Sequence, residues 1–222
     1  MLVGLKSSIN PEEIRNRERF APPCYEFYIR KTDSENEIQE AIEHVLGFTG
    51  NLVLHQPNDF DANKDQELNL QLCRKCVRLA EKNDLYGVVV HPLPEKKDTL
   101  DLWAGLDSDK VMVENLTHDY FRTMKQMLES PFPRIVFDVC HAFMVCKNND
   151  AMMEWIEALG SRVSWMHLAD SDGETHGQRI GRGKIDWSRV KRLDGKGIVE
   201  VVDENEVTAE EKIGSYLKLK WF

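Results

Sequence analysis

Short apolar runs that each end in one polar residue recur along the chain. Six of these runs close on a side chain that can bind a metal ion or a proton. A continuous apolar run of this length, bounded by loops, is typical of a strand buried on both faces of a parallel sheet. The runs are LVLH ending at His55, VVVH ending at His91, VMVE ending at Glu114, IVFD ending at Asp138, VSWMH ending at His167 and GIVE ending at Glu200.

The distance between the runs predicts a helix after most of the strands. The 145 residues from His55 to Glu200 span five intervals, so one interval averages 29 residues, which is about the size of a strand-plus-helix unit. The segment from Ser34 to Gly47 begins with a capping box of Ser34 and Glu37 and has its apolar residues on one face. Further amphipathic helices are predicted over 66–82, 120–128 and 152–159.

The two ends of the chain complete a repeating pattern of eight strands. LVGLKS (2–7) and YEFYIR (25–30) are expected as strands on either side of a helix around 11–20, and a last helix is expected over 208–219. Eight such units favour a closed, compact (β/α)8 barrel, and the absence of a Gly-rich turn after the first strand argues against an open doubly wound sheet. We expect one domain over residues 1–222.

Two connections of this barrel are shorter than the others. The segments after His91 and after His167 leave room for only a short helix each. Short connections leave little chain that could close over a bound molecule and exclude water. A barrel that binds a small molecule without catalysis is therefore kept as one interpretation.

Composition narrows the class of protein. The chain is 41% hydrophobic and 30% charged, with a formal net charge of −9, which is ordinary for a soluble protein. With no apolar run of membrane-spanning length and no secretory signal, we expect a cytoplasmic protein that does not contact membranes. The negative charge does not favour binding to nucleic acid.

Five cysteines, an odd number, argue against a disulfide framework. Cys73 and Cys76 form a C-x-x-C pair, which can serve metal binding or redox chemistry. However, Leu68, Leu72, Cys76 and Leu79 recur at helical spacing, so we interpret these thiols as small core residues on one helix.

The polar residues at the strand ends suggest a metal site. In a parallel barrel these side chains face one bowl, and three carboxylates in a dry bowl cannot all stay ionised without a compensating cation. Imidazole together with carboxylate suits manganese or zinc, with cobalt, iron or magnesium as alternatives, better than calcium. The alternative is that each residue is structural and has its own buried partner. His44 and His118 fall in helical contexts and are interpreted as surface residues.

Three motifs resemble a known superfamily. They are VFDVCHAF (136–143), HLADSDG (167–173) and IGRGKIDW (180–187). The sequence is similar to the xylose isomerase-like TIM barrels, which include sugar and sugar-phosphate isomerases and epimerases and also endonuclease IV (AP endonuclease family 2). The resemblance covers nearly the whole chain, but the motifs do not separate these branches.

In the isomerase and epimerase branch, the resemblance implies one metal ion and two glutamates that transfer protons. Glu114 and Glu200 would take a proton from, and return it to, the carbon next to a carbonyl, through an enediolate held on the divalent metal. His141 would contact a substrate hydroxyl. The resemblance assigns the metal to Glu114, Asp138, His167 and Glu200.

In the endonuclease IV branch, the resemblance implies three zinc ions. His55 and His91 would hold the first, with Glu114 as a bridge to the second, and His141 would serve the third. The third ion also requires a D-x-H motif shortly before the I-G-x-G segment. Here His176 follows Glu174 instead of an aspartate and lies one residue further from the glycine of that segment than the motif requires. The acidic loop after His55, with Phe60 as its one candidate wedge, offers little positive charge for DNA.

A small basic cluster follows the last of these histidines. Arg179, Arg182 and Lys184 are candidates to bind a phosphate or carboxylate of the substrate, and a solvated polar loop is the alternative.

We therefore expect a metal-dependent isomerase or epimerase of a small sugar or sugar phosphate. A zinc-dependent, endonuclease IV-like phosphodiesterase acting on DNA is the second interpretation. The sequence leaves open a homodimer as the oligomeric state.

Overall fold

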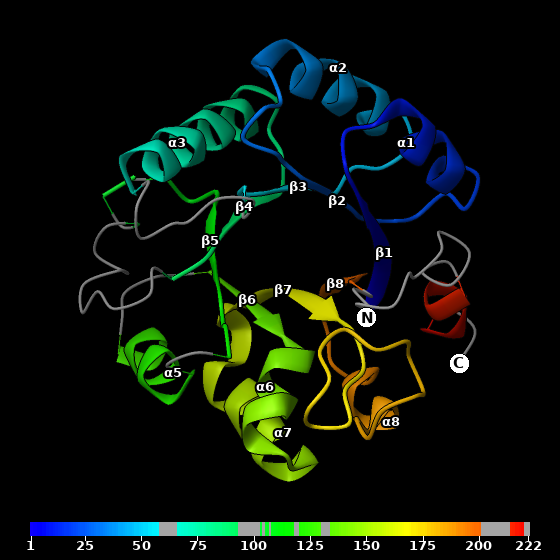
Figure 1. The fold of residues 1–222 in the computed structure, drawn as a ribbon, viewed down its shortest axis with the longest axis vertical. Helices are drawn as coiled ribbons and strands as arrows, with labels where there is room; N and C mark the ends of the chain where they lie inside the picture. Colours follow the sequence, from blue (N-terminus) through cyan, green and yellow to red (C-terminus); the bar gives the residue numbers. More distant parts are fainter. Residues whose placement is uncertain are drawn as a thin grey trace.

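The fold is a closed barrel of eight parallel strands. The computed structural model describes residues 1–57, 66–92, 103, 105–106, 108–117, 120–129, 134–200 and 214–219. Each strand pairs with the next in chain order and the last pairs with the first (Figure 1), which confirms the expected (β/α)8 architecture. The strands are β1 (Leu2–Ser7), β2 (Tyr25–Tyr28), β3 (Leu52–His55), β4 (Gly87–Val90), β5 (Val111–Glu114), β6 (Ile135–Asp138), β7 (Val163–Leu168) and β8 (Lys196–Val199).

Helices form the outer ring of the molecule (Figure 1). The second helix begins where the capping box predicts, because the Ser34 side chain accepts from the Glu37 backbone while the Glu37 carboxylate accepts from the Ser34 backbone. The helices are α1 (Pro11–Glu18), α2 (Glu35–Leu46), α3 (Gln66–Lys82), α5 (Tyr120–Glu129), α6 (Val139–Cys146), α7 (Asn149–Leu159) and α8 (Trp187–Val190), and residues 214–219 are also helical.

Several boundaries differ from the sequence expectation. The second strand ends at Tyr28 because the backbone N–H of Arg30 donates to the Asp33 side chain in a turn. His91 and Glu200 lie one residue past their strands. Helix α8 has only four residues, as expected for the short connection after β7. Four stretches that the sequence analysis singled out lie outside the described residues. They are 58–65 with Phe60, 93–102 after His91, His118, and residues 208–213 of the expected last helix.

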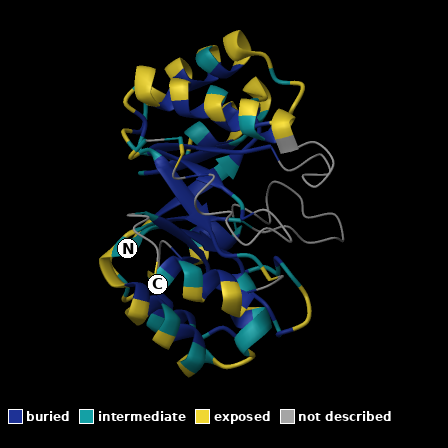
Figure 2. Cartoon of the chain, turned by 90° about the vertical axis from the view of Figure 1, so that its left-hand side faces the viewer, coloured by how far each residue is buried: buried dark blue, intermediate teal, exposed yellow. Residues whose placement is uncertain are grey.

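Two apolar layers hold the barrel. The larger one lies between the helices and the outer surface of the strands, and it includes Cys73 and Cys76, which are fully buried free thiols. Burial is concentrated in the strands, while the exposed residues lie on the outer sides of the helices (Figure 2). The smaller layer fills the barrel interior and consists of Cys24, Val53, Val89, Met112, Val136, Trp165 and Ile198.

The surface position of His44 and the expected lack of a membrane span were two further predictions from the sequence. His44 is about half exposed and pairs with Glu18, which agrees with its interpretation as a surface residue. Across the part of the chain that the structure describes, no helix is both long and apolar enough to cross a membrane.

A candidate metal centre at the carboxyl ends of the strands

A polar layer lies directly above the inner apolar layer. In a strand, residues two positions apart point to the same face, so a residue two positions after an interior apolar residue also faces the barrel axis. Val53 is followed in this way by His55, and Val136 by Asp138. Each of the eight strands contributes one polar residue to this layer, either from within the strand or directly after its end. These residues are Lys6, Glu26, His55, His91, Glu114, Asp138, His167 and Glu200.

Four of these residues form the centre of the bowl. Glu114, Asp138, His167 and Glu200 each offer one ligand atom, and these atoms all lie within 4.8 Å of one another. His167 Nδ1 is 2.6 Å from Glu200 Oε2 and 3.2 Å from Glu114 Oε1. His167 Nδ1 and Glu200 Oε2 are buried and have no hydrogen-bond partner. Unpaired ligand atoms that converge in this way fit a divalent cation.

The ring of His167 is held in the tautomer that a metal ligand requires. Its Nε2 lies 3.1 Å from the Glu26 carboxylate. A carboxylate can only accept, so Nε2 carries a hydrogen, and in the neutral ring Nδ1 has the free lone pair. That lone pair faces the oxygen atoms of Glu200 and Glu114, which themselves carry lone pairs. The three atoms repel one another unless a proton or a cation lies between them.

The pKa values reflect the same electrostatics. Burial works to lower the pKa of His167, but the carboxylates of Glu114, Glu200 and Glu26 outweigh it, and the pKa is well above its usual value. Burial works to raise the pKa of Glu114, but His167 and His91 hold it well below the usual value. The bowl is therefore a region of negative potential that attracts cations.

His55 and His91 converge on the other oxygen of Glu114. Their Nε2 atoms lie 3.3 and 3.1 Å from Glu114 Oε2 and 3.1 Å from each other. His55 Nδ1 lies 2.8 Å from the Gln56 carbonyl oxygen, which can only accept, so Nδ1 donates and Nε2 keeps a lone pair. Burial also lowers the pKa of His55, which favours the neutral ring. This group of three can hold a second cation next to the first.

A third group of ligand atoms shares Asp138 with the centre. Asp138, His141 and His176 bring their ligand atoms within 4.8 Å, and the two imidazole rings stack at 4.7 Å. His141 Nδ1 is 2.9 Å from the Asn115 carbonyl oxygen, which leaves Nε2 as the ligand atom. His176 thus joins the bowl despite its shifted spacing, while Glu174 is exposed and Asp138 supplies the carboxylate.

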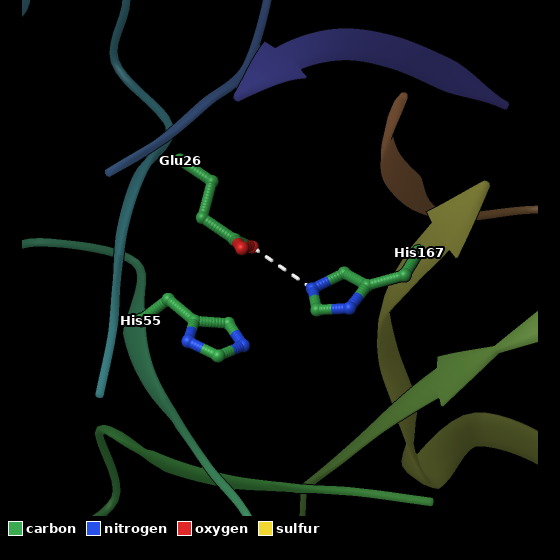
Figure 3. Close-up of side chains that lie close together, drawn as sticks. All are labelled: Glu26, His55 and His167. Carbon is green, nitrogen blue, oxygen red and sulfur yellow. Dashed lines mark hydrogen bonds and ion pairs between the residues drawn. The ribbon is translucent and has the colours of Figure 1, made fainter. Parts of the chain in front are cut away.

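Two members of the polar layer, Lys6 and Glu26, were not predicted from the sequence. Lys6 Nζ lies 2.8 Å from Glu26 Oε1 and 2.6 Å from Glu200 Oε1. Glu26 is fully buried, and its Oε2 also accepts from Trp165 Nε1 at 2.8 Å. Figure 3 shows that Glu26, from β2, and His167, from β7, point toward each other across the barrel.

The loop after β7 is built around a second buried carboxylate. Asp170 Oδ1 accepts from the backbone of Ser171 and Ile185, and Oδ2 accepts from the Gly181 backbone and Trp187 Nε1. The loop therefore folds back on its own start. It carries the basic residues singled out from the sequence, of which Arg182 and Lys184 are exposed and Arg179 is partly buried.

Comparisons with known proteins agree with this architecture. A family model described as xylose isomerase-like TIM barrel matches residues 20–213. A D-tagatose 3-epimerase-like protein superposes with a TM-score of 0.78 at 20% identity, covering 99% of this chain and 96% of that one. Endonuclease IV from Thermus thermophilus superposes with a TM-score of 0.70 at 17% identity, covering 99% of this chain and 98% of that one. No curated protein matches the chain.

A zinc-containing structure is also similar. The IOLI protein with a bound zinc atom gives a TM-score of 0.66 at 16% identity, covering 99% of this chain and 96% of that one. Likeness at these identities shows the fold, while the chemistry has to be argued from the residues of the bowl.

Proposed function

Because the chain belongs to the xylose isomerase-like TIM barrels, we propose that it is a metal-dependent isomerase or epimerase of a small sugar or sugar phosphate. The observation that carries this proposal is the convergence of Glu114, Asp138, His167 and Glu200, whose ligand atoms lie within 4.8 Å of one another. Two glutamates in one cation-binding set supply both a ligand and a proton acceptor, and an isomerase needs both.

The proposed reaction moves a proton at the carbon next to a carbonyl group. A divalent cation held by the four residues would supply Lewis-acid stabilisation for the negative charge that develops on the carbonyl oxygen. Glu200 is 18% exposed and Glu114 only 3% exposed, so Glu200 is the base that a substrate in the bowl reaches first. Glu114 would donate a proton of its own to the other face of the same carbon, so that Glu200 ends protonated and Glu114 ionised.

Other residues of the bowl would orient the substrate. His141 is 15% exposed, and because its Nδ1 is engaged by the Asn115 carbonyl, its Nε2 remains for a substrate hydroxyl. Arg179, Arg182 and Lys184 lie on the loop after β7 and are the candidates to bind a phosphate group of the substrate.

Deuterium exchange tests the proposal directly. The protein is loaded with manganese or cobalt and incubated in D2O with a panel of ketoses and ketose phosphates. We expect deuterium to enter the carbon next to the carbonyl, detected by NMR. Glu200→Gln and Glu114→Gln should each abolish the exchange, while Glu157→Gln on the exposed face of α7 should not. A metal-loaded protein that exchanges no proton in any of these compounds would contradict the proposal and favour a barrel that only binds.

A second candidate is a zinc-dependent phosphodiesterase that acts on DNA. It is favoured by one observation: His55, His91 and Glu114 form a ligand group of their own beside the central four, and Glu114 belongs to both. A carboxylate shared between two cation sites suits the in-line displacement of a phosphodiester.

Metal content and substrate separate the two candidates. One tightly bound ion per chain together with ketose exchange supports the isomerase. Two or three zinc ions per chain, with cleavage of duplex DNA that contains an abasic site, would replace it with the phosphodiesterase.

A further inference from the structure

Lys6 supplies a built-in positive charge inside the acidic bowl. Its side chain is only 12% exposed, and its ammonium bridges Oε1 of Glu26 and Oε1 of Glu200 at 2.8 and 2.6 Å. Lys6 therefore connects β1 to β2 on one side and to the end of β8 on the other.

Glu26 connects the same cation to His167. Its Oε1 pairs with Lys6, and its Oε2 accepts from Trp165 Nε1 and His167 Nε2. Glu26, His55 and His167 lie close enough together to hold a cation (Figure 3). However, both oxygens of Glu26 are already engaged, so a metal ion there would have to displace the ammonium and the ring N–H.

We propose that Lys6 and Glu26 act as a positioning pair that orients two ligands of the metal centre, Glu200 and His167, an inference that rests on the proposed metal centre. Lys6 holds Oε1 of Glu200, which leaves Oε2 directed at the centre. Glu26 holds Nε2–H of His167, which leaves Nδ1 directed at the same point. Partners behind metal ligands fix their tautomer and direction and typically change affinity 10- to 100-fold.

A simpler role for Lys6 would be that of a counter-charge. The bowl contains four carboxylates, of Glu26, Glu114, Asp138 and Glu200, and one ammonium offsets one of them. The two roles make opposite predictions for Lys6→Met. Removing a positive charge strengthens cation binding if Lys6 is only a counter-charge. Removing an orienting contact weakens cation binding if Lys6 holds Glu200 in place.

Titration with Co²⁺ alone tests the pair. The dissociation constant is measured by calorimetry, and the visible absorption of bound Co²⁺ reports the geometry of its ligands. Three variants are compared with the parent chain: Lys6→Met, the double variant Lys6→Met/Glu26→Gln, and Lys110→Met. Lys110 is a matched control, because its side chain is 18% exposed and pairs with Asp84, away from the bowl.

The double variant removes one charge of each sign, so the net charge of the bowl does not change. Replacing a buried ion pair by neutral side chains is often compatible with a stable fold, which keeps the test valid if Lys6→Met alone leaves Glu26 uncompensated and does not fold. Thermal unfolding of each metal-free variant checks this.

We expect the double variant and Lys6→Met to bind Co²⁺ about tenfold or more weakly, with a changed absorption spectrum, and Lys110→Met to bind like the parent. Parent-like affinity and spectrum in the double variant, or tighter binding by Lys6→Met, would overturn the positioning role and leave the metal centre intact. A parent chain that does not bind Co²⁺ would instead overturn the metal centre, and the positioning role with it.

Discussion

His167 Nδ1 and Glu200 Oε2 lie 2.6 Å apart without forming a hydrogen bond to each other. Because Glu26 accepts from Nε2 of the same ring, Nδ1 of the neutral ring carries a lone pair, and it faces a carboxylate oxygen. In the buried bowl such a contact is relieved only by a positive charge, which the metal-free protein can supply as a proton and the loaded protein as a metal ion. This pair is therefore the most direct structural reason to expect that metal binding stabilises the fold.

The first prediction concerns stability after metal is removed and restored. A metal ion at a hundredfold excess over its dissociation constant should stabilise the native state by about 2.7 kcal/mol. For a chain of this length, that corresponds to an increase in Tm of roughly 5–11 °C. Differential scanning calorimetry of the EDTA-treated protein, with and without added Mn²⁺, Co²⁺ or Zn²⁺, measures the increase. His44→Gln, far from the bowl, should show the same increase, while His167→Ala should lose most of it. An unchanged Tm with all three ions would contradict the metal centre.

The second prediction separates the outer histidines from the central four ligands. His91 is 19% exposed and contacts Glu114 Oε2, whereas His167 lies among all three carboxylates of the centre. If the reaction requires only the central cation, His91→Ala should keep ketose deuterium exchange within about tenfold of the parent rate, and His167→Ala should abolish it. Equal loss in both variants would place His91 in the reacting cluster and strengthen the phosphodiesterase candidate.

Six of the eight polar residues that surround the barrel axis could be predicted from the sequence because each closes an apolar run. Lys6 and Glu26 were missed because the residues around them hide that signal: Ser7 follows Lys6, and Glu26 lies between two aromatic residues of YEFY. Both residues could have been found from the two-residue period of a strand. Each polar residue follows an interior residue by two positions, as Glu26 follows Cys24 and His167 follows Trp165.

The position of His176 could not be predicted in the same way. It lies on an irregular loop, whose course depends on the contacts of Asp170 and not on a strand or helix period. Spacing within the motif suggested a poor fit, whereas the structure brings His176 to 4.7 Å from the His141 ring. Helix α6 was also not predicted, because it begins directly after β6, with Asp138 as its N-cap.

The third prediction concerns the cysteines and their dependence on pH. Burial raises the pKa of Cys24 and Cys76 to about 12 and also raises the pKa of Cys73 and Cys140. The thiolate is the reactive form, so a pKa of about 12 leaves on the order of one molecule in 10⁴ reactive at pH 8. Iodoacetamide should therefore modify the partly exposed Cys146 first in the native protein, and all five cysteines in urea.

Mass spectrometry of tryptic peptides measures the order of modification. The rate at the buried thiols should increase with pH up to the raised pKa, about tenfold per unit. Rapid alkylation of Cys73 or Cys76 at pH 8, or a disulfide between them after mild oxidation, would contradict their interpretation as core residues. It would instead support a redox or metal-binding role for the C-x-x-C pair.

The fourth prediction concerns Asp170, which holds the loop after β7. Its two oxygens accept four N–H groups, including Trp187 Nε1 at 3.0 Å and the Gly181 backbone at 2.7 Å. In Asp170→Asn, an amide NH2 must face one pair of these donors, so two charge-assisted hydrogen bonds are lost. At about 1.5–3 kcal/mol for each bond, the unfolding free energy should fall by about 3 kcal/mol or more, measured by urea unfolding followed through tryptophan fluorescence.

Asp172→Asn is the matched control for this substitution. Asp172 accepts from the backbone of Glu174 and Thr175 in an open turn of the same loop, and an asparagine side chain makes the same turn. Its effect on stability should be within about 0.5 kcal/mol. The loop carries His176 and the basic residues proposed to bind phosphate, so Asp170→Asn should also raise the KM for a phosphorylated substrate more than it lowers kcat. Equal stability of the two variants would show that the loop does not depend on the buried carboxylate.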